Sequence, residues 1–149
     1  MIYLKKFSSS VLFIIFLFLV LLDQVTKTVF SFSKDFGFFA ITPITNTGMS
    51  FGLFQGNNFA FILISLLFIF LIFLFRKEFK GYEIFLVMIL AGAVGNLIDR
   101  LIHGHVLDFI NFKFFPVFNV ADSLIFVGVA CIIFLEFKKS LNFKKSKKN

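Results

Sequence analysis

The sequence predicts an all-α membrane protein in which four helices cross the bilayer. Of its 149 residues, 59% are hydrophobic and 28 are Phe, and the mean hydropathy is +0.98. These values exclude an ordinary soluble domain. About 20 consecutive apolar residues are needed to cross a bilayer, and four stretches meet this requirement: 10–30, 58–75, 83–100 and 119–137. No repeat or linker separates them, so we expect 1–149 to form a single membrane-embedded domain.

The first apolar stretch follows Lys5 and Lys6 and could be mistaken for a cleavable signal peptide. It lacks an A-x-A-like exit, however, and it continues into "LLDQVTKTVF". A signal peptide would end in small residues at a cleavage site. We therefore interpret 10–30 as the first membrane helix.

The segment 31–57 has a different composition from the apolar stretches on either side of it. It is rich in Thr, Ile and Phe, and glycines and a proline interrupt it at Gly37, Pro43, Gly48, Gly52 and Gly56. This pattern is typical of short strands joined by turns. We expect a small β-structured platform near the membrane surface.

The second, third and fourth stretches complete the bundle. Residues 59–75 are apolar on all sides apart from Ser65, which predicts a helix surrounded by lipid. The connection 76–82 is short, so the second and third helices are expected to be antiparallel neighbours. The segment 101–118 is apolar for a loop and is expected to lie against the bilayer. Asn119 is a suitable N-cap for the fourth helix.

The basic residues predict the orientation of the chain. Eleven of the 15 flank the three ends assigned to one side of the membrane: Lys5, Lys6, Arg76, Lys77, Lys80, Lys138, Lys139, Lys144, Lys145, Lys147 and Lys148. Only Lys27, Lys34, Arg100 and Lys113 remain for the other side. Because basic residues concentrate on the cytoplasmic side, we expect both termini in the cytoplasm.

The net charge of +7 is largely carried by these cytoplasmic ends. We expect the basic tail, 138–149, to meet anionic membrane lipids, since such lipids attract juxtamembrane lysines. Binding of the tail to RNA or DNA is the disfavoured alternative, and we expect no nucleic acid partner. We expect the chain to act as a monomer.

Polar residues collect at the outer ends of the apolar stretches. Ionisable residues within membrane segments usually face the bundle interior and mark a functional site. The residues concerned are Asp23, Gln24, Lys27, Asn46, Asn96, Asp99, Arg100, Asp108, Asn119 and Asp122. Their accumulation on one leaflet predicts a single site there.

Helical spacing brings several of these residues to common faces. Asp23 and Lys27 are separated by four positions and can pair, either as support for the site or only to hold the helix end at the interface. Gly92, Gly95, Asn96, Asp99 and Arg100 share one face of the third helix. Small residues on that face allow a neighbouring helix or a substrate to approach the backbone.

Other polar and reactive residues have simpler interpretations. Asp99 and Arg100 are more readily explained as structural, because a guanidinium clamps a carboxylate or a backbone. Asn46 can equally be a turn residue in "NTGMSFG". His103 and His105 lack a third ligand at a recognisable spacing, so no metal site is predicted. Cys131 is the only cysteine, which excludes an internal disulfide and indicates a small buried hydrophobe.

Asp108 and Asp122 are the strongest candidates for chemistry. Each lies in an apolar setting, "VLDFI" and "NVADSLIF". If the two carboxylates approach one another, repulsion and poor solvation split their titration, so that one is protonated and the other ionised. Aspartic proteases use this arrangement: one carboxylate takes a proton from water while the other donates to the scissile carbonyl.

Two other classes of function remain open at this point. A small proton-coupled transporter could use the same aspartates, but its ionisable residues would be expected near the membrane midplane. A non-enzymatic scaffold would use the asparagines and aspartates only for stability. In that case Asp122→Asn would leave the function intact.

The motifs resemble those of the lipoprotein signal peptidase (signal peptidase II) family. They occur in the order "DQVTK" (23–27), "NTGMSFG" (46–52), "GAVGNLIDR" (92–100), "VLDFI" (106–110) and "FNVADS" (118–123) on a chain with four spans. The resemblance covers the chain from the first helix to the fourth. Each motif alone is weak, but five in order with this topology are specific.

The resemblance implies an aspartic endopeptidase of the bacterial inner membrane. Its substrates would be diacylglyceryl-modified prolipoproteins, cut just before the lipidated Cys, with no metal and no cofactor. Asp108 and Asp122 match the catalytic pair. The positions that match the substrate pocket are Asn46, Gly92, Asn96, Arg100 and Asn119; those expected to support it are Asp23, Lys27 and Asp99. The family also adds a β-structured platform and a surface helix on the outer side.

Overall fold

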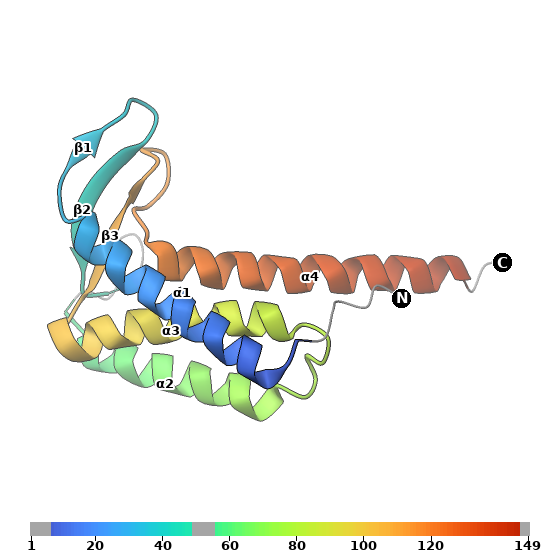
Figure 1. Ribbon diagram of the computed structural model, residues 1–149. Helices are drawn as coiled ribbons and strands as arrows, with labels where there is room; N and C mark the ends of the chain where they lie inside the picture. The colour runs from blue at the N-terminus through green and yellow to red at the C-terminus, as the bar shows by residue number, and fades with distance from the viewer. Residues whose placement is uncertain (1–6, 49–55, 147–149) are drawn as a thin grey trace.

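The structure is a computed structural model that describes residues 7–48 and 56–146, without the side chains of 143–146. Four helices dominate it (Figure 1): α1, Ser9–Val29; α2, Asn58–Phe75; α3, Glu83–His103; and α4, Val120–Ser146. All four are long and apolar enough to cross a membrane. The predicted set of four spans is therefore confirmed, whereas the cytoplasmic position of both termini stays a prediction.

Local capping chemistry explains where the helices begin and end. The Ser8 hydroxyl oxygen accepts a hydrogen bond from the Val11 N–H at 3.3 Å and caps α1. Helix α3 ends three residues later than predicted, at His103. Gly104 then adopts φ +75°, a left-handed conformation that glycine takes without a steric penalty.

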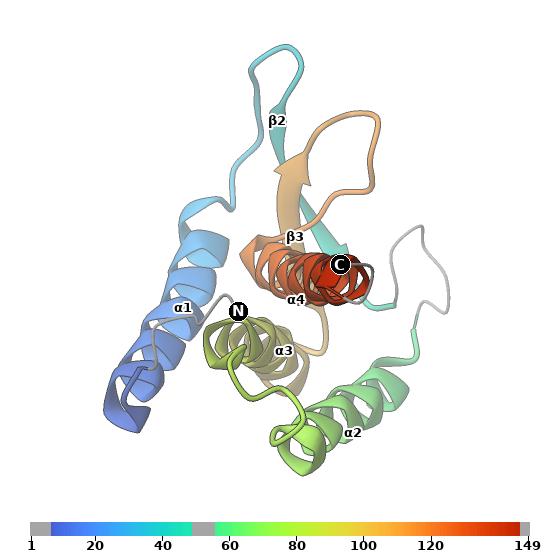
Figure 2. The same ribbon diagram turned by 90° about the vertical axis from the view of Figure 1, so that its right-hand side faces the viewer.

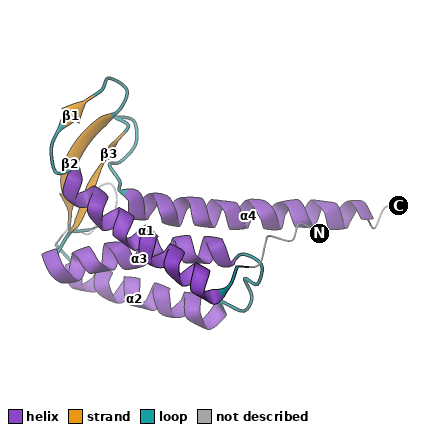
Figure 3. Cartoon of the chain, in the orientation of Figure 1, coloured by secondary structure: helices purple, strands orange, loops and turns teal. Residues whose placement is uncertain are grey.

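Helix α4 is longer than the predicted 119–137. It has 27 residues and continues to Ser146, so most of the basic tail belongs to the same helix (Figure 3). Lysine is a good helix former, and no Gly or Pro interrupts 129–146. The predicted boundary at 137 marked a change from apolar to charged residues, not the end of the helix.

Helix α3 is the centre of the bundle. It packs against the other three helices, as the view along the helices shows (Figure 2). In its most apolar window 44% of the residues are buried, compared with 6% in α1 and in α2. The outer faces of α1, α2 and α4 therefore carry exposed Phe, Leu and Ile side chains, which suit contact with lipid.

A three-stranded antiparallel sheet lies at one end of the bundle (Figure 3). Its strands are β1, Lys34–Asp35; β2, Ala40–Asn46; and β3, Val106–Asn111, in the order β1-β2-β3. The strands predicted within 31–57 are confirmed. The surface helix implied by the resemblance is not present among residues 7–48 and 56–146.

Strand β3 corrects the prediction that 101–118 is a loop. Its pattern "VLDFIN" does not alternate cleanly, because apolar residues point to both faces. It becomes a strand by pairing with β2, with Ile44 opposite Asp108. The residues of one strand carry little information about a partner strand this far away in the chain.

Glycines allow α3 and α4 to approach closely. A Cβ on Gly92 would clash with the Ala121 carbonyl oxygen and lie 2.8 Å from Ile125 Cγ1. A Cβ on Gly128 would lie 2.9 Å from the Phe85 carbonyl oxygen. Small residues at such contacts are what close helix packing in membranes requires.

We expect Gly92→Val to destabilise the protein by about 1–3 kcal/mol, because the added side chain meets backbone atoms that cannot rotate away. The measurement is the thermal unfolding midpoint of the purified protein in detergent. Ile64→Val, on the exposed face of α2, is the control and should leave the midpoint unchanged. An unchanged midpoint for Gly92→Val would contradict the close approach of α3 and α4.

Candidate active site

The first turn of α4 holds Asn119 and Asp122 in a reciprocal cap. The Asn119 side-chain oxygen accepts from the Asp122 backbone N–H at 2.9 Å, and Asp122 Oδ2 accepts from the Asn119 backbone N–H at 3.3 Å. This is the geometry of a capping box with Asp in the third helical position. The predicted N-cap is confirmed, and the cap fixes the Asp122 carboxylate at the helix end.

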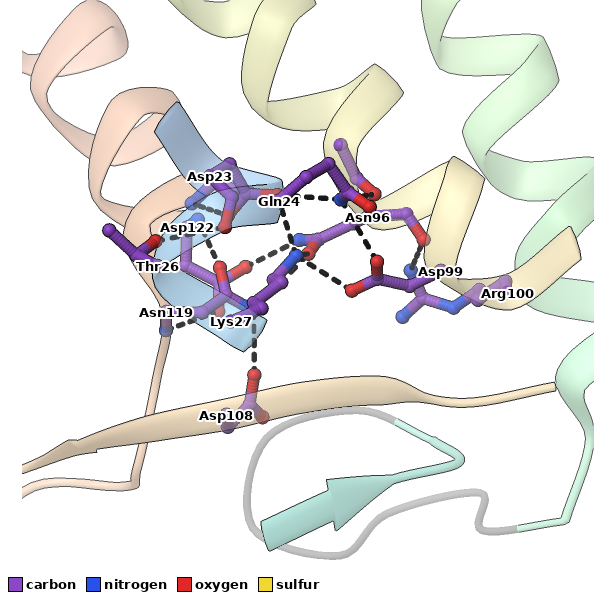
Figure 4. A network of polar contacts seen from close by, with 12 residues as sticks. Asp23, Gln24, Thr26, Lys27, Asn96, Asp99, Arg100, Asp108, Asn119 and Asp122 are labelled. Carbon is purple, nitrogen blue, oxygen red and sulfur yellow. Dashed lines mark hydrogen bonds and ion pairs between the residues drawn. The ribbon is translucent and has the colours of Figure 1, made fainter. Parts of the chain in front are cut away.

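Asp108 lies on β3 with its carboxylate held by two amides. Asn119 Nδ2 donates to Asp108 Oδ1 at 2.7 Å (Figure 4). Asn46 Nδ2 donates to Asp108 Oδ2 at 2.8 Å. The residue is 4% exposed. Asn46 comes from the neighbouring strand β2, so the sheet pairing brings these two residues together.

Asn119 contacts both carboxylates. Its side-chain amide nitrogen donates to Asp108, and its backbone N–H donates to the Asp122 carboxylate. Asn96, on α3, donates from Nδ2 to Asp122 Oδ1 at 2.8 Å. The aspartates thus reach one site from separate elements, while among the described contacts no hydrogen bond joins one carboxylate directly to the other.

The environment of Asp108 raises the pKa of its carboxyl group. Burial in a poorly solvated position is the main cause that raises its pKa, and the nearby Asp122 carboxylate raises it further. The hydrogen bonds from Asn46 and Asn119 act in the opposite direction, as does the charge of Lys27. The net result is a pKa of about 6 for Asp108, raised from an ordinary value of 3.8.

A buried lysine lies behind this site. Lys27 Nζ is 2.7 Å from Asp23 Oδ2 and 2.7 Å from Asp99 Oδ2, and it donates to Asn96 Oδ1 at 3.0 Å. The predicted Asp23–Lys27 pair is therefore confirmed. Because Lys27 holds the oxygen of the Asn96 amide, the nitrogen of that amide is directed at Asp122 (Figure 4).

Asp23 also supports the start of α4 from α1. It is fully buried, and its Oδ1 accepts from the Ala121 backbone N–H at 2.9 Å. A carboxylate at this position satisfies a free N–H of the first helical turn and interacts favourably with the helix dipole. Asp23 also fills the space above Gly95, where a Cβ would clash with its carboxylate.

Gln24 belongs to the polar residues predicted to form one site, and the structure shows its contacts. Its Nε2 donates to Asp99 Oδ1 at 2.9 Å and to the Gly95 carbonyl oxygen at 3.2 Å, which ties α1 to α3. The spacing in the sequence indicates this position, because Gln24 lies three residues before Lys27 and the two therefore share one helical face.

Arg100 faces α2 and is not paired with its neighbour Asp99. Its Nη1 donates to the Asn96 carbonyl oxygen at 3.3 Å, and its guanidinium carbon is 5.5 Å from the centre of the Phe61 ring. Asn58 donates to the Arg100 carbonyl oxygen at 3.1 Å. In the described part of the chain, Arg100 Nε is buried and has no hydrogen-bond partner.

Gly92, which the resemblance assigns to the substrate pocket, is buried on α3 against the Ala121 carbonyl of α4. Its contact with a substrate stays a prediction. The part of the "NTGMSFG" motif at 49–52 lies outside the described residues. Asn46, from the same motif, is described, and its contact is with Asp108.

The chain matches the family model described as signal peptidase (SPase) II over residues 15–138. It is 44% identical to the lipoprotein signal peptidase of Caldanaerobacter subterraneus subsp. tengcongensis, over 82% of this chain and 92% of that protein. It is 37% identical to the lipoprotein signal peptidase of Thermodesulfovibrio yellowstonii, over 91% and 99% of the two chains.

Two solved bacterial membrane enzymes share the fold of this chain. A bacterial membrane enzyme solved by the in meso method at 2.3 Å resolution is similar with a TM-score of 0.82 and 30% identity, over 93% of this chain and 94% of that one. A second, solved at 1.9 Å, is similar with a TM-score of 0.75 and 29% identity, over 92% and 97% of the two chains. Because the family model and the relatives cover most of the sequence, this chain belongs to the signal peptidase II family.

Proposed function

We propose that this protein removes the signal peptide from diacylglyceryl-modified prolipoproteins, cutting just before the lipidated Cys, with Asp108 and Asp122 as an aspartic dyad. The names of its relatives support the substrate class. The observation that carries the proposed chemistry is the position of Asn119 between the two acids: its side chain donates to the Asp108 carboxylate, and its backbone N–H donates to the Asp122 carboxylate. These contacts bring the buried Asp108 and the capped Asp122 to the same site.

The two aspartates have different roles in the proposed reaction. Asp122 accepts a proton from a water molecule as the water oxygen attacks the scissile carbonyl carbon, and Asp108 donates its proton to the carbonyl oxygen. In the second step the C–N bond breaks. The proton on Asp122 then passes to the leaving amide nitrogen, and Asp108 recovers a proton from a hydroxyl of the intermediate.

The surrounding side chains divide into positioning and substrate-binding groups. Asn46, Asn96 and Asn119 are engaged with the carboxylates, so we assign them mainly to orienting the dyad. Arg100 is the group we assign to the substrate, because its Nε lacks a partner in the described residues. A guanidinium can hold a backbone carbonyl of an extended peptide.

The membrane setting fits a substrate that carries acyl chains. The polar network lies at the end of the bundle where the sheet is attached (Figure 4). We place this end at the outer face of the bacterial cytoplasmic membrane, with both termini in the cytoplasm. A lipidated substrate would enter laterally from that leaflet, and holding it there would position its peptide bond for reaction.

The test of this function is cleavage by the purified protein in lipid vesicles. The substrate is a synthetic prolipoprotein segment with a diacylglyceryl-modified Cys, and mass spectrometry identifies the released signal peptide and its new C-terminus. We expect one cut, directly before the modified Cys. Absence of cleavage, or equal cleavage of the same segment with an unmodified Cys, would contradict the proposal.

The pKa of Asp108 predicts a pH dependence. Because Asp108 must be protonated to donate, we expect kcat/KM to fall as the pH rises through about 6, and to fall about tenfold for each further pH unit. The measurement is the pH profile of signal-peptide release, with the substrate held well below KM. A profile that is flat from pH 5 to about 8 would show that Asp108 is not the proton donor.

A further inference from the structure

A cluster of phenylalanines occupies the end of the sheet where the β1–β2 turn and the segment after β3 leave it. These segments belong together because Asp35 pairs with Ala40 and Ala40 pairs with Asn111. The members of this cluster, which we call the aromatic tip, are Phe36, Phe38, Phe39, Phe112, Phe114, Phe115 and Phe118.

Most of the rings in the aromatic tip contact one another. The ring centres of Phe39 and Phe112 are 5.7 Å apart, which joins the two segments. Phe36 stacks on Phe39 at 5.6 Å, and Phe114 lies 6.1 Å from Phe112. These are ordinary aromatic pair distances. The tip is therefore a continuous apolar surface carried by two segments far apart in the sequence.

The outermost rings of the tip are strongly exposed. Phe114 is 85% exposed and Phe38 is 78% exposed, the two highest values among the large hydrophobic residues described. Phe115, next to Phe114 in the sequence, is 58% exposed. A contiguous group of exposed rings is unfavourable in water and marks a surface that contacts another apolar phase or partner.

The position of the aromatic tip indicates that it contacts lipid. The sheet lies across the ends of the helices, and its tip projects sideways beyond α1 and α4 (Figures 1 and 2). The outer surfaces of these helices are lined with exposed apolar side chains, such as Phe18 and Phe126, which meet lipid. A structure that extends sideways past a lipid-facing bundle lies over lipid, so the tip continues the lipid-facing surface.

Charged residues beside the tip suit the same location. Lys34 Nζ lies 5.1 Å from the centre of the Phe36 ring, and Lys113 Nζ lies 2.8 Å from Asp35 Oδ2. Two lysines and one aspartate give this region a net charge of +1, counted as +2 − 1. Lysine side chains beside apolar rings are typical of the interface, where the rings enter the acyl region and the amines reach lipid phosphates.

We propose that the aromatic tip inserts into the boundary between headgroups and acyl chains of the adjacent leaflet and fastens the sheet to the bilayer. Strand β3 leads directly from Asp108 to the tip, so this anchor holds that strand at a fixed height relative to the membrane. The inference depends on the membrane-spanning bundle and the sheet, and it does not depend on the proposed catalytic roles.

The chain contains no Trp, so a single introduced Trp reports its own surroundings. Phe38→Trp and Phe114→Trp would be reconstituted separately into vesicles of phosphatidylglycerol and phosphatidylcholine, with and without bromine on the acyl chains. We expect a loss of fluorescence in brominated vesicles, stronger when bromine is near the headgroup than when it is near the chain end. Phe68→Trp, on the exposed face of α2, is the control for the acyl region.

A second set of variants tests whether quenching at the aromatic tip results from its insertion into the bilayer or only from the local packing of its rings. Phe115→Trp would be measured alone and together with Phe38→Ser and Phe114→Ser, and we expect the two serines to reduce its quenching by brominated lipids. The proposal would be overturned if the Trp residues at positions 38 and 114 fluoresced as in water, were quenched by acrylamide and were insensitive to brominated lipid. That result would also be seen if the tip contacts a separate protein instead of the bilayer.

Discussion

Replacement of Asp122 by Asn, or of Asp108 by Asn, is expected to lower kcat for signal-peptide release by about 10²–10⁴-fold. Asn has nearly the same shape as Asp, so it fills the same space. It cannot take a proton from water at position 122 or donate a carboxylic proton at position 108. Because the two groups act as a unit, the double variant should be little slower than either single variant.

The control for these variants is Asp35→Asn. Asp35 lies on the same sheet, but its side chain is 64% exposed, pairs with Lys113 and accepts a hydrogen bond from the Gly37 N–H. It should retain wild-type kcat. Each variant would first be shown to reconstitute and to unfold at a temperature close to that of the wild type. Cleavage at the wild-type rate by either Asp108→Asn or Asp122→Asn would refute the dyad.

Lys27→Met is expected to have the largest effect on stability. Its side chain is 6% exposed, and its ammonium group is the cation that balances both Asp23 and Asp99. Removing one partner from a buried ionic group leaves uncompensated charge and costs about 3–5 kcal/mol. The expected result is a large decrease in the thermal unfolding midpoint in detergent, together with reduced cleavage.

A double variant distinguishes the effect of losing the Lys27 charge from the effect of losing its hydrogen bond to Asn96. Lys27→Met with Asp99→Asn removes one charge of each sign, so part of the lost stability should return. The hydrogen bond from Lys27 to Asn96 stays absent, and we therefore expect cleavage to remain impaired. Lys139→Met is the matched control, because its pair with Glu136 is exposed and such pairs contribute about 0–1 kcal/mol. Full recovery of cleavage in the double variant would limit Lys27 to a structural role.

The sequence was sufficient for the parts of the fold that depend on local patterns. Apolar stretches of membrane-spanning length predicted all four helices, and an Asn at the start of the fourth predicted its cap. The i, i+4 spacing predicted the pair of Asp23 and Lys27. In each case the partners lie within one helix or one turn, where the geometry is fixed by the helix itself.

The remaining features depend on contacts between distant segments. Strand β3 exists because β2 pairs with it, and the position of Asp108 beside Asn46 follows from that register. The small face of α3 could meet a neighbouring helix or a substrate, and only the structure shows that Gly92 packs against Ala121 of α4. The contact between Lys27 and Asn96 joins two helices, and spacing along one helix cannot show it.

Asp108 and Asp122 are proposed to lie close enough for the charge of the Asp122 carboxylate to raise the pKa of Asp108. The most direct measurement is a pH titration of the Asp108 carboxyl group by infrared or ¹³C spectroscopy, in the wild type and in Asp122→Asn. We expect Asp108 to titrate with a pKa of about 6 in the wild type. In Asp122→Asn its pKa should be lower, because the neighbouring negative charge is gone. A wild-type pKa near the ordinary value of 3.8, or one that Asp122→Asn leaves unchanged, would contradict the account.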